Sequence, residues 1–516
     1  MECKGFELFC ANIQFLTLSS RFRWVFCQLE ALRHCFPSNL RQFLNKLPDT
    51  LDETYERMLR GINKAQADEA YRLLQCLIVA ARPLRVEELA ELLAFDFQPS
   101  TPGRIPELRV DWRWDDEEEA ILSTCSSLIA IVHNGDSRVV QFSHFSVKEY
   151  LTSPRLAQSP CVDVSRFHID LEPAHTIMAQ ACLATLLRPD EHGGKSDAKQ
   201  SPLVKYAAQY WVEHAQFEMV SSRVQDGMDD LFDNSKPHFA AWLEVHDIDE
   251  PLSIFASGYY PDRLGSPLYY AAFCGFYNLA ERLIQKYPEQ INAQGGHVVA
   301  PLPAALLKRH FTVANLLYKH GAVVDVENDV AETLLHAASV SGHVDIMRWL
   351  LGHGADANAR NYVSRTPLHY AVLNMHFEAI QILLDHGVDI DSQSITDKTP
   401  LYDLLSSCSS SSEGMVDVIQ RLLEHGADTN IPDHRQSTAL HLASSSGWPE
   451  VARLLLSYGA KVDEKDEKSR TPFEVAASKG RHEMMKLLFE HGAVPTLSFL
   501  LPTRSNNLLR QYQKSW

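Results

Sequence analysis

The C-terminal half of the chain repeats itself at a nearly constant period, and this periodicity limits the fold more than any other feature of the sequence. Copies of a Thr-Pro-Leu-like box lie 34, 33, 33, 33, 39 and 33 residues apart and begin at Ser266, Ala300, Thr333, Thr366, Thr399, Thr438 and Thr471. A Leu-Leu pair and a terminal glycine recur in the same phase; the glycines are Gly321, Gly354, Gly387, Gly426, Gly459 and Gly492. Three landmarks with one period predict a solenoid, in which each unit packs against its neighbours.

Each unit is predicted to hold two helices. A threonine caps the first helix, and proline is tolerated at the first helical position because its missing N–H would have no partner there. The second helix carries the Leu-Leu pair and ends at the glycine, which can adopt the left-handed conformation of a helix C-cap. A polar stretch such as residues 356–365 leads to the next unit. Because one helix pair is too small to bury its own apolar face, stacking supplies the core.

The box resembles that of the ankyrin repeat family. Residues 366–371 fit the family's T-P-L-H-x-A pattern, and residues 438–443 depart from it only at the proline. The resemblance covers about residues 265–494, with about seven repeats, of which the first two are degenerate. It implies an ankyrin α-solenoid with β-turn fingers. The longer step of 39 residues places a surplus in the Ser-rich tract at residues 406–414, which we interpret as a surface loop rather than a phosphorylated switch.

The N-terminal half shows no repeat. Residues 20–65 and 70–81 are predicted to form helices, and Pro83 precedes another helix. Asn134-Gly135 lies between two apolar runs, which is a strong signal for a β-hairpin. Helices followed by a hairpin are typical of a winged helix.

Residues 83–93 and 141–151 resemble the winged-helix region of fungal NACHT-ankyrin NLR-like signalling proteins, a region also named after a GPI inositol-deacylase. Residues 160–247 resemble the helical connector that follows it. The fold class is therefore expected to be mainly α. The expected domains are a helical segment resembling the end of a NACHT-type module (1–69), a winged-helix-like domain with a small β-hairpin (70–155), a helical connector (156–256), the ankyrin array (257–494) and a C-terminal tail (495–516).

Catalysis is not expected, because the motifs that would support it are incomplete. The family that the chain resembles carries a P-loop NTPase upstream, but the nearest P-loop-like string here, at residues 193–196, has Pro189 where the first loop glycine is needed. We interpret it as a linker and expect no ATP turnover and no cofactor. Residues 443–447 lack the first glycine of a nucleophile elbow, and Ser143 and His144 are predicted to face opposite sides of a strand.

The 23 histidines do not predict a metal site. His336, His369 and His441 recur once per unit, so we expect them to form structural hydrogen bonds between units. Five others precede the glycine that ends each second helix, where a histidine can satisfy the free carbonyl groups; they are His320, His353, His386, His425 and His491.

The charge balance and the absence of membrane-spanning runs and Cys-x-x-Cys pairs limit the classes of ligand that we expect. The net charge of −18 disfavours general binding to nucleic acid, which needs a basic face. Glu87, Glu88 and Glu91 outnumber Arg85 on the helix of the winged helix that would read DNA. No apolar run is long enough to cross a membrane, and no two cysteines form a Cys-x-x-Cys pair. We expect a cytoplasmic protein without a nucleic-acid, membrane or small-molecule ligand.

The sequence thus predicts a non-catalytic scaffold that recognises a protein partner through its ankyrin repeats, in intracellular signalling or sensing. Two alternatives stay open: the sensor half of an ATP-dependent NLR-like switch whose NTPase is absent from this chain, and a DNA-binding winged-helix regulator. In ankyrin arrays the partner meets the turn tips and the exposed end of each first helix. Carried onto this chain, that implies a binding surface at Asp329, Val330, Glu332, Tyr362, Val363, Arg365, Leu373, Asn374, Ile395, Thr396, Lys398, His434, Arg435 and Ser437.

We expect partner contact to centre on Tyr362, Val363 and Ile395. They are apolar where a turn could be wholly polar, and Arg365 lies beside them in the sequence. Tyr and Arg are enriched at binding hot spots. The turn at Glu467 and Lys468 is expected to be merely solvated.

Overall fold

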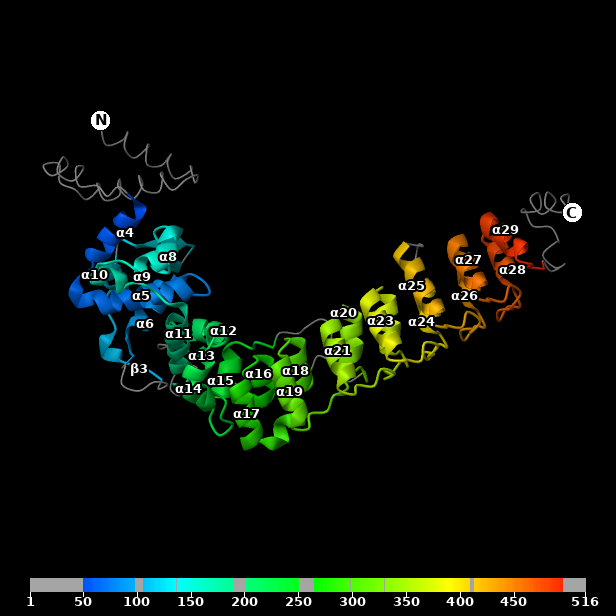
Figure 1. Cartoon of the computed structure of the whole chain (residues 1–516). Helices are drawn as coiled ribbons and strands as arrows, with labels where there is room; N and C mark the ends of the chain where they lie inside the picture. Colours follow the sequence, from blue (N-terminus) through cyan, green and yellow to red (C-terminus); the bar gives the residue numbers. More distant parts are fainter. Residues whose placement is uncertain are drawn as a thin grey trace, which may run out of the picture. The chain divides into compact units, whose positions relative to one another are not determined.

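The computed structural model describes residues 50–494 apart from residues 98–104, 126, 136, 189–200, 250–263, 297, 329 and 409–412. The helices predicted before residue 50, the linker at residues 193–196, residues 409–412 of the Ser-rich tract and the tail from residue 495 therefore lie outside the described residues. The chain divides into two compact units between Ile248 and Asp249. Figure 1 labels many of the elements of both units.

The first unit is mainly helical and contains short antiparallel strands. Its described helices are α4 (Leu51–Arg60), α5 (Ala67–Val79), α6 (Val86–Leu93), α7 (Glu117–Cys125), α8 (Phe145–Leu151), α9 (Pro154–Ala157), α10 (Val162–Ser165), α11 (Leu171–Leu186), α12 (Val204–Ala215), α13 (Val220–Arg223), α14 (Gln225–Leu231) and α15 (His238–Val245). Its described strands are β1 (Leu84–Arg85), β2 (Phe95–Asp96), β3 (Glu107–Leu108), β4 (Ile129–Asn134) and β5 (Ser137–Phe142).

The predicted β-hairpin is confirmed. Strands β4 and β5 pair antiparallel, with Ile129 opposite Phe142 and Asn134 opposite Ser137. Strand β1 pairs with the other side of β5, so the sheet order is β1-β5-β4. Helices α5, α6 and α7 pack against one another, and α5 and α6 also contact the sheet. This arrangement is that of a winged helix.

The helices after the hairpin pack directly against the winged helix. Helix α11 contacts both α5 and α12, and the hydroxyl of Tyr206 in α12 accepts the backbone N–H of Ala81 at 3.1 Å. Farther along, Trp211 and Trp242 are fully buried and meet edge to face, with ring centroids 5.3 Å apart. The winged helix and the helices that follow it therefore form one compact unit.

The second unit is a stack of helix pairs, which Figure 1 shows side by side in chain order. Its described first helices are α16 (Pro267–Phe273), α18 (Pro301–Leu307), α20 (Leu334–Ser341), α22 (Pro367–Leu373), α24 (Pro400–Ser407), α26 (Ala439–Ser446) and α28 (Pro472–Ser478). The second helices are α17 (Tyr277–Lys286), α19 (Phe311–Lys319), α21 (Val344–Gly352), α23 (Phe377–Asp385), α25 (Glu413–Glu424), α27 (Pro449–Ser457) and α29 (His482–Glu490). The predicted solenoid of helix pairs is confirmed.

The helix caps also follow the prediction. The Thr399 side chain accepts the N–H of Tyr402 at 3.3 Å, and capping boxes begin at Thr333, Thr366, Thr438 and Thr471. The glycines that end the second helices from Gly321 to Gly492 have φ between 70° and 93°. Before them, His353, His386, His425 and His491 each donate from Nδ1 to the carbonyl four residues earlier, at 2.7–2.9 Å.

A buried histidine joins a unit to the next one. The Nδ1 atom of His369 accepts the backbone N–H of Thr366 at 3.1 Å, so its Nε2 carries the proton, and Nε2 donates to the Lys398 carbonyl at 3.1 Å. His336 and His441 make the same contacts, ending on the carbonyls of Arg365 and Arg470. The structural role predicted for these histidines is confirmed.

A second ladder links the turns that follow the second helices. Asn358 accepts the backbone N–H of Asp389 at 2.8 Å, and Asp391 accepts that of Asp428 at 3.1 Å. The same position supplies the acceptor in other units; its occupants are Asn292, Asp325, Asn358, Asp391, Asn430 and Asp463. The Asp391–Asp428 bond forms across the longest repeat, so the surplus residues leave the ladder intact.

The Leu-Leu landmark is only partly a core feature in the fourth unit. Leu383 is 0% exposed, whereas Leu384 is half-buried. Only the first leucine of this pair is therefore part of the core.

Leu383→Ala should lower the free energy of unfolding by about 2–5 kcal/mol, because it leaves a cavity that the neighbouring side chains only partly fill. Leu384→Ala is the matched control and should cost clearly less, since part of its side chain already meets water. Urea unfolding followed by circular dichroism measures both. Equal costs for the two variants would contradict the assigned packing of α23.

The buried histidines should make the array less stable in mild acid. Burial lowers the pKa of His369 to about 4, and the pKa values of His336 and His441 are lowered for the same reason. In the unfolded chain, histidine has its ordinary pKa near 6.5. Between about pH 4 and pH 6.5, the unfolded chain therefore binds more protons than the folded array. The stabilisation is therefore complete above about pH 6.5 and is lost as the pH falls toward 4.

His369→Gln removes one titrating group and should reduce this pH dependence. We expect the wild type to lose about 2 kcal/mol more than the variant between about pH 7.5 and pH 5, measured by urea unfolding at each pH. The variant will be less stable at pH 7.5, but only the difference in slope tests the idea. The same slope in both proteins would show that His369 is not held neutral.

Candidate protein-binding surface

The turns between helix pairs form β-turn fingers whose tips are joined by backbone hydrogen bonds. We define the fingers as residues 328–332, 361–365, 394–398, 433–437 and 466–470. Tip N–H groups donate to the carbonyl groups of the preceding finger at 2.9–3.2 Å; the pairs are Tyr362 to Val330, Ile395 to Val363, His434 to Thr396 and Glu467 to Arg435. The predicted tip residues that the structure describes therefore lie along one continuous edge of the second unit.

An Asn or Asp side chain shapes most of these fingers. Oδ1 of Asn361 accepts the N–H groups of Val363 and Arg365 at 3.1 and 2.9 Å, and Asn328, Asp433 and Asp466 act in the same way. Each finger also contains a non-glycine residue in the left-handed region, with φ of 56–57°; these residues are Ala331, Ser364, Asp397, Gln436 and Ser469. The side-chain hydrogen bonds help to hold this costly conformation.

Large apolar side chains are exposed to solvent at two neighbouring tips. Tyr362 is 70% exposed, Ile395 62% and Val363 39%. The backbone bond from Ile395 to Val363 places these tips next to each other. Neighbouring exposed apolar side chains are typical of a surface that is covered in use.

Arg365 is not free, contrary to the role expected from its position. Its guanidinium lies 2.8 Å from a carboxylate oxygen of Asp403, whose side chain is almost fully buried in α24. Lys398 contacts the same carboxylate at 3.6 Å and also donates to the Ser406 hydroxyl at 3.1 Å. Arg365 and Lys398 of the predicted surface thus compensate a buried charge.

Glu332 is engaged as well. The Tyr370 hydroxyl donates to its carboxylate at 2.8 Å, and the Asn361 side-chain amide lies 3.2 Å from the same oxygen. Burial and this hydrogen bond to Glu332 raise the pKa of Tyr370 to about 12. The three residues form a polar network that joins fingers 328–332 and 361–365 to α22.

The other predicted residues differ in accessibility. His434 and Arg435 are exposed at their tip, whereas Val330, Thr396 and Ser437 are half-buried. At the far end of α22, Leu373 is half-buried, and the exposed Asn374 donates its side-chain amide to the Tyr370 carbonyl at 2.9 Å. Asp329 lies outside the described residues.

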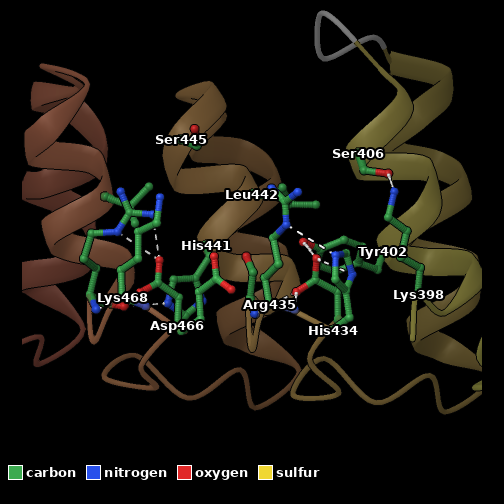
Figure 2. Close-up of a pocket in the computed structure, with 15 residues that line it drawn as sticks. Lys398, Tyr402, Ser406, His434, Arg435, His441, Leu442, Ser445, Asp466 and Lys468 are labelled. Atoms are coloured by element: carbon green, nitrogen blue, oxygen red, sulfur yellow. Dashed lines mark hydrogen bonds and ion pairs between the residues drawn. The ribbon is translucent and has the colours of Figure 1, made fainter. Parts of the chain in front are cut away.

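A hollow of about 440 Å³ lies beside the last three fingers, between their inner sides and the first helices. Figure 2 shows its lining residues, which come from neighbouring units. They are Lys398, Tyr402, Ser406, Asp433, His434, Arg435, Ser437, His441, Leu442, Ser445, Asp466, Glu467, Lys468, Arg470 and Val475.

Most residues that line the hollow are not among those predicted from the sequence to bind a partner. Leu442 and Val475 occupy the variable position of their boxes, and the exposed Lys468 was expected to be only solvated. The variable position of the T-P-L-H-x-A box could have identified Leu442 and Val475, because this position faces the fingers in these units.

In the winged helix, the acidic side chains of α6 are paired within the protein. Glu88 is fully buried and contacts Arg82 at 2.7 Å and Arg85 at 2.9 Å. Glu91, also buried, pairs with Arg113. The charges on this helix therefore act within the unit, and Arg85, the cation weighed against them, is one of their partners.

His144 has a capping role rather than a place on a strand. Strand β5 ends at Phe142, and His144 is the N-cap of α8, where its Nδ1 accepts the backbone N–H of Ser146 at 3.1 Å. Over the described part of the chain, no group of three or more histidine, cysteine or acidic side chains could hold a metal ion. Nor is any described helix both long and apolar enough to cross a bilayer.

Comparison with protein families gives two matches. Residues 302–394 and 405–498 match the family described as ankyrin repeats (3 copies). Residues 55–162 match the GPI inositol-deacylase, winged helix domain.

Two known proteins illustrate the similarity. "Azaphilone pigments biosynthesis cluster protein L" of Monascus ruber is 33% identical over 308 residues, covering 56% of this chain and 62% of the relative, so the chain spans less than two thirds of that protein. The crystal structure of the ankyrin repeat domain of Bcl-3, "a unique member of the IkappaB protein family", aligns at a TM-score of 0.39 with 29% identity, over 43% of this chain and 98% of that one.

The family matches agree with the observed architecture of both units. In the first unit, helices α5, α6 and α7 pack against one another, and α5 and α6 contact the small antiparallel sheet. The second unit holds helix pairs with polar fingers. The chain therefore combines a winged helix domain of the GPI inositol-deacylase type with an array of ankyrin repeats, a fold that serves as a scaffold for protein–protein interaction.

Proposed function

We propose that this chain is a non-catalytic scaffold in intracellular signalling, which recognises a protein partner through the finger tips around Tyr362 and Ile395. The observation that carries the proposal is the exposure of these two large apolar side chains on adjacent tips. Burying such side chains against a partner stabilises a complex by removing apolar surface from water. The backbone ladder between the tips supports this role, because it presents them on an ordered edge.

The contacts of Arg365 change its part in the proposal. A guanidinium that already compensates the buried Asp403 offers less to a partner, and its position is set by the array. We therefore assign partner binding to Tyr362, Val363 and Ile395, and we assign Arg365 and Lys398 a supporting role beneath the surface.

The winged helix favours a second, broader proposal, in which this chain acts as the sensor part of an NLR-like switch. The match of residues 55–162 supports this context. The internal pairing of Glu88 and Glu91 supports a packing role for the winged helix rather than DNA reading. Searching the gene upstream for a P-loop tests the switch directly.

Tyr362→Ala combined with Ile395→Ala should weaken partner binding by at least about 2 kcal/mol, the scale of a hot spot. Neither side chain is packed in the core, so unfolding by urea should change little. The partner is first captured with the full chain as bait, and calorimetry then gives the affinity of each variant.

Val494→Ala with Tyr458→Ala is a matched control. These side chains are also apolar and exposed, at 65% and 43%, but lie outside the fingers. The proposal would be contradicted if the Tyr362/Ile395 variant bound the partner as the wild type does, or if the control variant lost as much affinity. Either result would show that the binding surface is not centred on these tips.

Arg365→Ala should destabilise the array by about 1–3 kcal/mol, because Asp403 would keep only the more distant Lys398 as a counter-charge. In a chain that already carries Asp403→Asn, the same substitution should cost much less. Urea unfolding of the four proteins gives the coupling energy between the two residues. A coupling near zero would mean that the ion pair contributes nothing to stability.

A further inference from the structure

The hollow beside the last three fingers reverses the charge balance of the chain. It is lined by four Lys or Arg and three Asp or Glu side chains, in a protein with 48 basic and 66 acidic residues. We propose that this hollow binds an acidic segment of the partner protein, with Arg435 and Lys468 as the groups that meet its carboxylates. The inference rests on the proposed function, since it names the chemistry of a partner bound on the same fingers.

Two of the acidic side chains in the hollow are already used within the fold, and Asp433 is the first. Its Oδ1 accepts the N–H groups of Arg435 and Ser437, each at 2.9 Å, and its Oδ2 accepts the Tyr402 hydroxyl at 2.8 Å. These bonds shape the finger. Because both carboxylate oxygens are engaged, Asp433 offers little to a cationic ligand.

Asp466 is committed in the same way. Its Oδ1 accepts the N–H groups of Lys468 and Arg470 at 2.9 and 2.8 Å, and its Oδ2 accepts two hydrogen bonds from the Arg470 guanidinium at 2.9 and 2.7 Å. The pKa of Asp466 is lowered, although burial opposes this, because these donors favour the charged carboxylate. Arg470 and Asp466 thus neutralise each other inside the fold.

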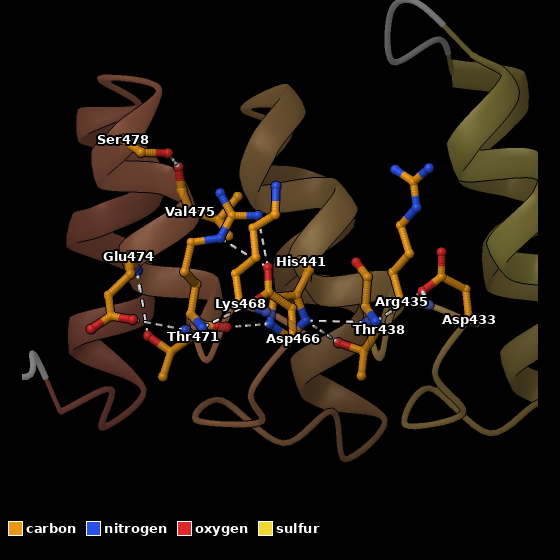
Figure 3. Close-up of polar contacts among 12 residues, drawn as sticks. Asp433, Arg435, Thr438, His441, Asp466, Lys468, Thr471, Glu474, Val475 and Ser478 are labelled. Carbon is orange, nitrogen blue, oxygen red and sulfur yellow. Dashed lines mark hydrogen bonds and ion pairs between the residues drawn. The ribbon is translucent and has the colours of Figure 1, made fainter.

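Arg435 and Lys468 have no such counter-charge. Within the described chain, neither side chain has a carboxylate within ion-pair range, and the Arg435 Nε lies 3.3 Å from Nε2 of His434. Figure 3 shows both side chains rising from their fingers toward the first helices. Unpaired cations in a concave site concentrate anions, and a guanidinium binds a carboxylate through paired hydrogen bonds.

The floor of the hollow suits a peptide. Leu442 in α26 and Val475 in α28 supply apolar surface, and the Ser445 hydroxyl lies on the next turn of α26. The volume of about 440 Å³ accommodates a few side chains rather than a folded domain. Acidic side chains alternating with aliphatic ones would therefore match both the rim and the floor.

One finger that lines the hollow adjoins the apolar tips. The N–H of His434 donates to the carbonyl of Thr396, so the finger that carries Arg435 adjoins the finger that carries Ile395. One extended segment can cover both, with aliphatic side chains on Tyr362 and Ile395 and carboxylates on Arg435 and Lys468.

The test uses the full chain and two fluorescein-labelled synthetic peptides. One alternates Glu with Leu, and the matched peptide replaces each Glu by Gln. Fluorescence anisotropy at low salt should show at least about tenfold tighter binding of the acidic peptide, because both cations then gain a counter-charge. Its affinity should fall steeply as sodium chloride is raised, since salt screens exposed charges.

Arg435→Gln combined with Lys468→Gln should reduce the affinity for the acidic peptide at least about tenfold. Arg453→Gln with Lys465→Gln is the matched control, because it removes the same charge from exposed positions outside the hollow and should change affinity less than about twofold. Circular dichroism of both variants checks that they fold as the wild type does.

Three results would overturn the inference: equal affinity for the Glu and Gln peptides, wild-type binding by the Arg435/Lys468 variant, or tighter binding of a labelled single-stranded oligonucleotide that the same variant abolishes. The peptide assay needs no natural partner. If it fails while Tyr362→Ala and Ile395→Ala still weaken capture of the partner, the proposed function stands without the acidic segment.

Discussion

The order of the ankyrin array depends on a buried imidazole that makes two hydrogen bonds in opposite directions. In His369, one ring nitrogen accepts from the cap of its own helix and the other donates to the backbone of the next finger. A backbone carbonyl left unpaired in that position would cost about 1–3 kcal/mol, so the ring fixes where the finger can lie. The finger in turn sets the position of its tip. The exposed surface is therefore positioned by contacts made in the interior.

Some units that lack the histidine place another polar side chain at the same position. In the fifth unit Tyr402 takes its place, and its hydroxyl reaches past the carbonyl to Asp433, the residue that shapes the next finger. In the first unit Tyr269 donates to Asp249 at 2.7 Å, and in the last unit Glu474 closes the cap with its own carboxylate. The histidine donates to a backbone carbonyl of the next finger, whereas Tyr402 donates to the side chain of Asp433. It also helps to form the hollow, because Tyr402 and Asp433 both line it.

The sequence predicted the repeating framework well and the surface only in part. Caps, glycines and the role of His336, His369 and His441 follow from local preferences, which depend on residues close together in the chain. The pairing of Arg365 with Asp403 spans two units, and nothing in the box marks Asp403 as an acid that will be buried. The hollow was missed for the same reason, since Arg435 and Lys468 come from different fingers. The exposure of Tyr362 and Ile395 could be predicted because a large apolar residue is conspicuous among the polar neighbours of a turn.

The three kinds of contact between units keep the same polarity along the chain. The Asn or Asp of one unit accepts from the next, as Asn358 does from Asp389; the histidine donates to the next, as His369 does to Lys398; and each tip N–H donates back to the unit before it. An internal unit thus offers its successor a set of groups like the one that its predecessor offered to it. A duplication or loss of one whole unit in the gene would rejoin matching partners at these three repeated contacts. The repeated framework can therefore grow or shrink over evolution and carry a new pattern of tips, whereas a unit-specific pair such as Arg365 and Asp403 must be kept or lost together.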